Sequence, residues 1–305
     1  MTLVTDRAAT GRTAPGKPPR LRGRRRSPVF DAPTPLGIAG RYGALVLMVL
    51  LTIGPLLWQL STSLKSKSED IYAETPQLLP QDPTFANYGE VTRVVPVLDF
   101  ATNSLIVAAM SVLGNLIGAT LAGFALARVD FRGRKLVVGL FMATLVLPGE
   151  ATIISQFQTV NNLGLTDTLV GIVLPGLIGT VNVLLMYNAF RSLPRELDDA
   201  AVIDGATVWQ RLRHIGLPAV KGTLSIVAIL CFIGAWDDFL WPLLVVQDPE
   251  KLTLTVGLAY LKGQFSADPR LIAAGTVIAL VPVLVLFATL QRYFFRGVEE
   301  GAVKG

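Results

Sequence analysis

Asp199-Ala-Ala-Val-Ile-Asp204-Gly205-Ala206 is a charged stretch between two long apolar runs, and it continues as Thr207-Val-Trp-Gln-Arg-Leu-Arg-His-Ile-Gly-Leu217-Pro218. Gly205 permits the positive φ that a sharp turn after a helix requires. Thr207, followed three residues later by Gln210, predicts a capping box that opens a second short helix. Pro218 is expected to end that helix. The stretch therefore predicts a helix-turn-helix loop.

Each short helix of this loop is expected to have an apolar side. Leu197, Ala200 and Ala201 form that side on the first helix, and Leu212 and Ile215 form it on the second. Apolar sides of short helices commonly dock into grooves of partner proteins. The loop is therefore a candidate docking element.

The composition indicates an integral membrane protein. The chain has 305 residues, of which 51% are hydrophobic and 16% charged, which is too apolar for an ordinary soluble protein of this size. Its single cysteine, Cys231, excludes an internal disulfide and a cysteine-based zinc site. The single histidine, His214, cannot build an HExxH motif, and no P-loop is present. The chain itself is therefore expected to bind no metal or cofactor and to hydrolyse no ATP.

Apolar runs of about 20 residues predict membrane-spanning helices. Six runs occur, at residues 42–60, 100–127, 136–157, 168–190, 222–245 and 271–294. Residues 1–40 are rich in Arg, Pro and Gly, and we expect a disordered basic tail there rather than a nucleic-acid site. The predicted organisation is a tail (1–40), a first helix with its outer loop (41–99), a five-helix core (100–297) and a C-terminal tail (298–305).

The distribution of basic residues predicts the orientation. Of the 27 Lys and Arg residues, 21 lie at residues 1–41, in the 128–135 turn, in the 191–221 loop and at the C-terminal end, residues 292–305. Cytoplasmic segments of membrane proteins are enriched in Lys and Arg, and anionic lipid of the inner leaflet attracts such segments. We therefore expect both termini and the 191–221 loop on the cytoplasmic side of the plasma membrane.

Three acidic residues, Glu150, Asp237 and Asp238, fall inside apolar runs, where an unpaired charge costs ~2.5–3.5 kcal/mol. At 1.5 Å per residue, Glu150 would lie ~21 Å along a straight third helix and Asp237 ~22 Å along the fifth. Two interpretations stay open for these acids. They either form a shared layer in the outer half of the membrane that faces a water-filled cavity, or cap helix breaks beside Pro148-Gly149 or interact with the headgroup region.

Other polar and aromatic residues of the apolar runs also leave two interpretations. Trp236 and Trp241 could stack on a sugar ring or belong to the aromatic belt of the membrane interface. Asn115, Asn182 and Asn188 could line a path or hydrogen-bond neighbouring helices. Helix kinks or ends are expected at four prolines, Pro148, Pro175, Pro242 and Pro282.

The stretch at 199–218 resembles the EAA loop of permease subunits of binding-protein-dependent ABC importers. That pattern is Glu-Ala-Ala, three residues, Gly and a later Leu-Pro; here Asp199 stands for the Glu and Leu212 for a common Phe. The resemblance implies a cytoplasmic coupling helix seated in a groove of an ATPase subunit. The positions that it assigns to this coupling are Asp199, Ala200, Ala201, Asp204, Gly205, Ala206, Leu212, Leu217 and Pro218.

A second stretch, Gly234-Ala-Trp-Asp-Asp-Phe-Leu-Trp-Pro242, resembles sugar permeases of the maltose-transporter type. Asp237 stands where that family usually has an amide. Further matching segments are Asn103–Ile106, Ala125–Arg134, Leu147–Ala151, Phe190–Glu196, Gln291–Phe294 and Gly301–Gly305. The resemblance covers residues 42–305, and the candidate translocation path comprises Glu150, Trp236, Asp237, Asp238 and Trp241.

The resemblance implies an all-α, type I ABC importer permease fold with six transmembrane helices. The implied function is import of a sugar or related polyol by alternating access. The implied partners are a second permease subunit, two ATPase subunits that carry ATP and Mg, and an extracytoplasmic solute-binding protein. The alternative is a proton-coupled secondary transporter with Glu150 and Asp238 as its relay. An enzyme is disfavoured because the sequence has no catalytic constellation.

Overall fold

The computed structural model describes residues 35–73, 77–260 and 268–302. Within these ranges it describes side chains from residue 37 to residue 289. These ranges contain helices and no strand. Most of the tail predicted at 1–40, with its Arg20–Arg26 run, lies outside the described residues. The chain divides into two units, residues 1–53 and 54–305. The described part of the first unit belongs to helix α1 (Pro35–Ser63).

Helix α1 carries apolar side chains all round. Every residue from Leu45 to Leu51 is an exposed large hydrophobic residue. A helix that is apolar on all sides requires an apolar surrounding such as a bilayer. Gly37–Ser63 of α1 is one of three continuous helices among the described residues that are long and apolar enough to cross a membrane; the others belong to α3 and α14.

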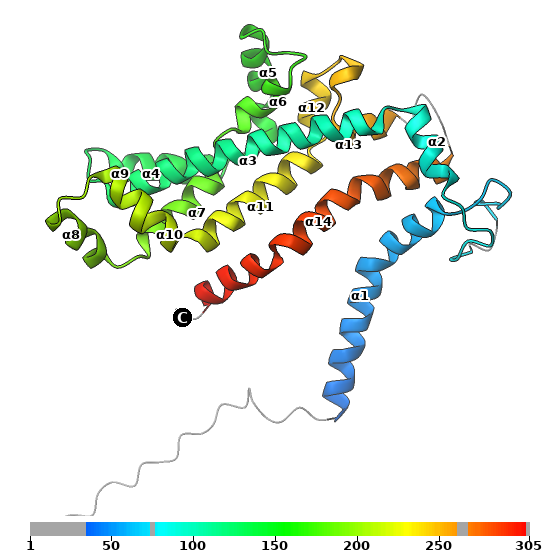
Figure 1. The fold of residues 1–305 in the computed structure, drawn as a ribbon, viewed down its shortest axis with the longest axis horizontal. Coiled ribbons are helices and arrows are strands. Elements are labelled where there is room, and N and C mark those ends of the chain that lie inside the picture. The colour runs from blue at the N-terminus through cyan, green and yellow to red at the C-terminus, as the bar shows by residue number, and fades with distance from the viewer. Residues whose placement is uncertain (1–34, 74–76, 261–267, 303–305) are drawn as a thin grey trace, which may run out of the picture. The chain divides into compact units, whose positions relative to one another are not determined.

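Helix α3 (Val97–Arg128) is the central element of the second unit. It packs against α7 (Thr180–Arg191) and α11 (Lys221–Asp237), and α14 (Pro269–Ala302) packs against α11 (Figure 1). Small residues bring α3 and α7 close together, as is common between membrane helices. A Cβ atom on Gly123 would lie 2.6 Å from Met186 Cβ and 2.8 Å from the Tyr187 nitrogen.

The predicted third and fourth spans are not straight helices. The third consists of α4 (Arg134–Thr144), η2 (Gly149–Thr152) and α5 (Ile153–Asn162), and its two halves differ in direction by 100°. The fourth consists of α6 (Leu169–Val173), η3 (Leu174–Gly176) and α7, with a bend of 47°. The third span breaks just before Pro148-Gly149 and the fourth just after Pro175-Gly176; prolines and glycines interrupt helical hydrogen bonding. The straight helix on which the depth of Glu150 was predicted is therefore absent.

The predicted fifth span also breaks. Helix α11 ends at Asp237, and α12 (Leu240–Val245) follows after two residues. The continuous helix ends where the sequence changes from apolar residues to Asp237-Asp238. Pro282, by contrast, lies inside α14 without ending it. At its other end, α11 is bent by 79° against the preceding helical segment Val208–Ala219. Counting each of the three bent pairs among the described residues as one span gives up to six spans.

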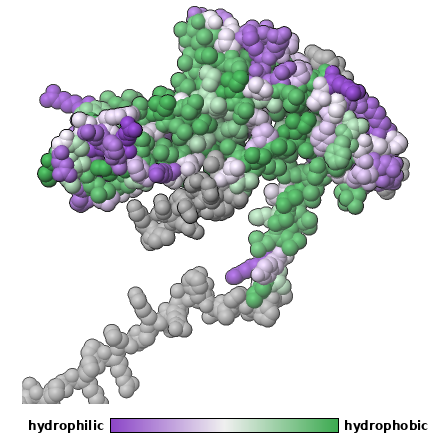
Figure 2. All heavy atoms as spheres, viewed as in Figure 1, coloured by the Kyte–Doolittle hydropathy of each residue, from purple (hydrophilic) through white to green (hydrophobic). Residues whose placement is uncertain are grey.

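The remaining elements gather at the two ends of α3 (Figure 1). One end carries α8 (Arg195–Ile203), α9 (Val208–Arg211), η4 (Leu212–Gly216) and α10 (Leu217–Ala219). The other end carries α2 (Ala86–Val94), η5 (Pro249–Lys251) and α13 (Leu254–Tyr260). Hydrophobic residues cover the long helices in Figure 2, and hydrophilic residues concentrate at the element ends.

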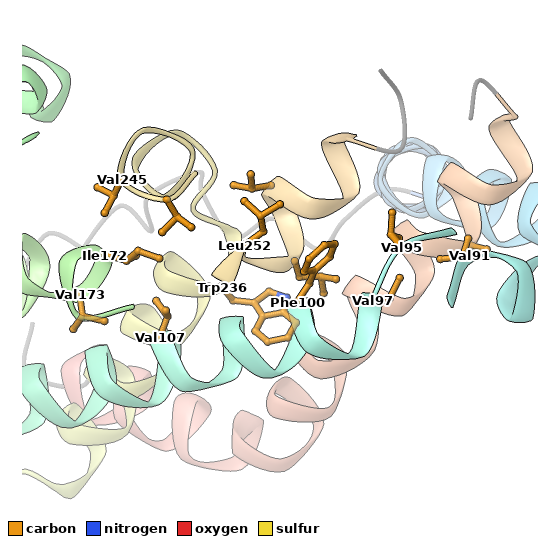
Figure 3. Close-up of a cluster of buried hydrophobic side chains, with 14 of the residues drawn as sticks. Val91, Val95, Val97, Phe100, Val107, Ile172, Val173, Trp236, Val245 and Leu252 are labelled. Carbon is orange, nitrogen blue, oxygen red and sulfur yellow. The ribbon is translucent and has the colours of Figure 1, made fainter. Parts of the chain in front are cut away.

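Two buried clusters hold the second unit together. One joins α3 to α11, α13 and α14 and includes Phe100, Trp236 and Leu254; Figure 3 shows Phe100 and Trp236 within it. The other joins α3 to α7 and to the α8–α10 end, and includes Phe124 and Phe190, whose rings meet edge to face at 5.2 Å. Both ends of α3 are therefore anchored by apolar packing.

Asp167 connects the α5–α6 loop to the loop after α12. Its carboxylate accepts the N–H groups of Gln247 (2.6 Å) and Asp248 (3.0 Å), and its own N–H donates to Val245 O (2.9 Å). Its φ of 56° lies in the left-handed region that Asp and Asn tolerate. The N–H groups of Gln247 and Asp248 lower the pKa of the Asp167 carboxyl below its ordinary value of 3.8.

We predict that this carboxylate makes stability pH-dependent. A group with a depressed pKa in the folded protein stabilises it above the unfolded pKa, and the stabilisation is lost as the pH falls through the folded value. Asp167→Asn keeps the backbone conformation but cannot titrate. In thermal unfolding of detergent-solubilised protein, the wild type should be more stable than Asp167→Asn at pH 6. The difference should shrink below about pH 4; a constant difference would contradict the assignment.

Candidate functional site

The first candidate site is the loop formed by α8, α9, η4 and α10. Helix α8 ends in a Schellman motif: Ala206 N–H donates to Ala201 O (2.9 Å), and Gly205 N–H donates to Val202 O (3.0 Å). Gly205 has φ 78°, and the predicted positive φ is confirmed. The motif reverses the chain direction after α8, so the loop has the predicted helix-turn-helix form.

The second half of the loop begins with the predicted capping box. The Thr207 hydroxyl accepts from Gln210 N–H, and the Gln210 side chain accepts from Thr207 N–H. Pro218 does not end this helix. The helical path widens into the π-helix η4, where Leu217 N–H donates to Leu212 O, and runs on through α10. The wider turn accommodates a proline, which cannot donate to an earlier carbonyl.

The loop divides the predicted docking residues into two groups. Leu212 and Ala201 are 3% and 8% exposed. Leu212 belongs to a buried core cluster of the chain, so the expectation that these two side chains face a partner is wrong. Leu217, Ile215 and Ala206 are partly buried. Leu197, Asp199, Ala200, Asp204, Gly205 and Pro218 are exposed.

The exposed face of the loop is apolar as well as acidic. Ile203 is 85% exposed and Trp209 60%. Leu197, Val202 and Val208 are also exposed large hydrophobic residues of the same loop. Exposed apolar side chains clustered with charged ones are typical of protein interaction sites. The sequence pattern had singled out only Leu197 of these five.

An ion pair network underlies this face. Asp198 accepts from Arg128 at 2.9 Å and from Arg211 at 3.5 Å, and the three side chains are at most 17% exposed. Arg128 also donates to Phe190 O (2.9 and 2.6 Å) and to Leu193 O. Sequence analysis missed Asp198 and Arg128. The available signal was that Asp198 precedes Ala201 by three residues, and so shares its helix face.

The second candidate site is a cavity of about 530 Å³ between α3, η2–α5, the α6–α7 break and the α11–α12 break. Its polar lining comprises Ser111, Asn115, Glu150, Gln156, Asn182, Cys231, Asp238 and Trp241. The described lining residues include two carboxylic acids and no Lys or Arg. A concave site with a few convergent polar groups in an apolar wall is typical of small-molecule binding.

Asp238 fits both interpretations left open by the sequence. Its carboxylate accepts from Trp241 N–H (3.4 Å), which caps the start of α12, and the residue also lines the cavity. Trp241 lines the cavity while its indole N–H donates to Ile172 O (3.0 Å). Glu150 lies on η2 at the cavity and is exposed.

Two predicted path residues lie elsewhere. Trp236 is 4% exposed, stacks on Phe232 at 5.6 Å and donates to Ala279 O (3.1 Å). Figure 3 shows it inside the buried cluster with Phe100, and it does not line the cavity. Asp237 is exposed and does not line the cavity. Successive residues at the end of a helix point in different directions, which separates Asp237 from Asp238.

Asn115 hydrogen-bonds the backbone groups at the break in the fourth span. Its amide group donates to Ser111 O (3.0 Å) and Gly176 O (3.1 Å), and its oxygen accepts from Gly179 N–H (2.7 Å). Asn182 donates to the same oxygen (2.9 Å) and to Cys231 Sγ (3.1 Å). Asn115 and Asn182 thus both bond neighbouring helices and line the cavity, whereas Asn188 is exposed.

No group of three or more metal-ligating side chains occurs in the part of the chain that the structure describes.

Comparisons with known proteins converge on one family. Residues 101–300 match the family described as binding-protein-dependent transport system inner membrane component. The permease protein of the sulfoquinovosyl glycerol transport system of Agrobacterium fabrum is 31% identical over 267 residues, covering 87% of this chain and 93% of the relative. The permease protein of the trehalose transport system of Mycobacterium tuberculosis is 31% identical over 264 residues, covering 85% and 95%.

The fold also matches a solved structure. A chain of a bacterial ABC transporter involved in the import of the acidic polysaccharide alginate superposes with a TM-score of 0.77 at 24% identity. The match covers 88% of this chain and all of the other. The arrangement of helices expected from the sequence resemblance is thereby confirmed.

We predict that Asn115 is required for stability. Asn115→Leu leaves Gly176 O and Gly179 N–H without their side-chain partner at a part-buried break, at a cost of about 1–3 kcal/mol for the two together. The midpoint of thermal or chemical unfolding of the detergent-solubilised protein should fall clearly. Asn188→Leu, at an exposed position of the same helix pair, is the control and should change it little; equal effects would contradict the assigned role.

Proposed function

Because this chain belongs to the family of inner membrane components of binding-protein-dependent transport systems, we propose that it is one of two permease subunits of an ATP-driven importer for a sugar or related polyol. The match over residues 101–300 supports this most directly, since it includes both candidate sites. The chain is a multi-pass membrane protein, and its 305 residues contain no P-loop. ATP hydrolysis therefore belongs to separate subunits.

The α8–α10 loop is the proposed contact with the ATPase. Its exposed residues, among them Ile203 and Trp209, supply the apolar anchors that interface hot spots favour. The excess of Lys and Arg on its side of the membrane supports a cytoplasmic location, with both termini on that side. By the resemblance of the loop, two ATPase subunits, each with ATP and Mg, serve the two permeases. A solute-binding protein delivers the solute on the opposite side.

The cavity is the proposed part of the translocation path in this subunit. Carboxylates and amides at Glu150, Gln156, Asn182 and Asp238 provide the hydrogen-bonding groups that hydroxyl-rich solutes need. Two acids without a cation in the described lining disfavour an anionic solute. We therefore propose a neutral carbohydrate. Reorientation of the helices around this cavity would expose it alternately to the two sides.

Reconstitution tests the proposal. The purified complex in proteoliposomes, with the co-expressed binding protein outside, should accumulate the carbohydrate that the binding protein retains, and only with ATP on the ATPase side. Uptake that survives ATP depletion but collapses with the proton gradient would overturn the proposal in favour of a proton relay through Glu150 and Asp238.

We predict that Gly205→Asp uncouples ATP hydrolysis from transport. The substitution puts a charged side chain at a position with φ 78° on the proposed contact face, where L residues are strained. Insertion should be normal and uptake should fall at least tenfold. Gly133→Asp is the matched control, because Gly133 also has a positive φ, of 88°, with open space around it. Wild-type uptake by Gly205→Asp vesicles would refute the assignment.

We further predict that Asp238→Ala impairs solute passage more than assembly. The variant removes a carboxylate from the cavity, and uptake by assembled complex should fall about tenfold or more, on the order of the loss of one charged hydrogen bond. Asp238→Asn keeps an acceptor for Trp241 N–H but removes the charge, so it distinguishes a loss of helix capping from a loss of charge. Asp237→Ala is the control beside it, outside the cavity. Full rescue of uptake by Asn would assign Asp238 to capping alone.

A further inference from the structure

Asp198 is the meeting point of three elements. It lies on α8, yet its carboxylate pairs with Arg128 at the end of α3 (2.9 Å) and with Arg211 on α9 (3.5 Å). The side chains of Arg128, Asp198 and Arg211 are 6%, 17% and 13% exposed. Ion pairs this sheltered from water are much less screened than surface pairs. The network therefore holds α8 and α9 at a fixed position against α3.

Arg128 extends the network to a fourth element. Its guanidinium donates to Phe190 O and Leu193 O, which lie at the end of α7 and just beyond it. The Phe190 carbonyl is one of the last four of α7, which a helix leaves without an intrahelical partner. One side chain thus joins the end of α3, the end of α7 and the start of the α8–α10 loop.

The helices joined in this way form walls of the cavity. Ser111 and Asn115 lie on α3 and Asn182 on α7, and all three line the cavity. Apolar packing supports the same junction, because Leu212 of the loop belongs to the buried cluster that contains Phe124 and Phe190. A displacement of the loop must therefore move α3 and α7 unless the ion pairs break.

The negative charge of Asp198 is required for this junction, because it pairs with the two guanidinium groups of Arg128 and Arg211. Removing Asp198 leaves two sheltered guanidinium groups close together, and breaking a buried ion pair by loss of one partner is strongly destabilising for that contact. Among the described residues, Arg211 Nε has no hydrogen-bond partner, and the ion pair of Arg211 is the one with Asp198. The loop would then remain attached to α3 and α7 only through apolar packing such as that of Leu212, without the directional ion pairs.

We infer that Asp198 is a positioning residue that couples the α8–α10 loop mechanically to the cavity walls α3 and α7. Movement of the loop by an ATPase subunit then changes the access to the cavity. This inference rests on the proposed function, because the ion pairs transmit a movement only if a partner protein moves the loop. Arg128 and Arg211 act with Asp198 as its two attachment points.

Cys231 offers a readout that needs no knowledge of the solute. It is the single cysteine of the chain and lines the cavity. In the complete complex in proteoliposomes, its labelling by a small maleimide, measured on this chain by mass spectrometry, reports access to the cavity. The labelling rate is compared without nucleotide and with ATP plus vanadate, and ATP hydrolysis is measured in parallel.

In the wild type, ATP plus vanadate should change the labelling rate at least fivefold. Asp198→Asn should keep at least half of the ATP hydrolysis but reduce that change to less than twofold, and Asp198→Glu should restore part of it. Asp130→Asn is the matched control, because Asp130 pairs with Arg134 at the same end of α3 but is 99% exposed. It should behave as the wild type.

Each other outcome has a defined meaning. A wild type without a nucleotide-dependent change would overturn the proposed function, and the inference with it. A normal change in Asp198→Asn would overturn the inference alone. If Asp198→Asn fails to assemble, the test uses Arg211→Gln, which leaves the Arg128–Asp198 pair intact. An assembled Arg211→Gln complex with a reduced change supports the connection, and one with a wild-type change overturns it.

Discussion

Backbone groups inside a membrane need partners within the protein, and this constraint shapes the second unit. The fourth span breaks between η3 and α7, which frees a carbonyl at Gly176 and an N–H at Gly179. Asn115 of α3 satisfies both. Irregular backbone at membrane depth is tolerated only where protein or a water-filled cavity surrounds it. The break therefore exists because a neighbouring helix supplies an amide at the correct level.

The breaks also create the cavity. If the third, fourth and fifth spans were straight helices, they would pack along their whole length and leave no cavity between them. Instead, the bend of 100° after α4 brings Glu150 to the same space as Asp238, which follows the end of α11. Acids that are costly in lipid thus face a polar space. The non-helical segments that interrupt the spans therefore place the polar side chains that line the candidate path.

Helix α3 connects the two candidate sites. Its middle carries Ser111 and Asn115 at the cavity, and its last residue, Arg128, binds Asp198 of the loop. A helix is stiff along its axis, since each turn is braced by hydrogen bonds. The close approach to α7 at Gly123 adds a second stiff element. Loop and cavity are therefore joined by rigid parts, which is what transmission of a displacement requires.

The sequence by itself determined the membrane class, the helical character, the turn at Gly205 and the capping box at Thr207, because each depends on composition or on neighbours within a few residues. The tertiary structure alone decided the angles at Pro148 and Pro175, the burial of Trp236 and Leu212, and the pairing of Arg128 with Asp198. Hydropathy reports how apolar a segment is but not its direction, and contacts between residues 70 positions apart depend on packing between helices.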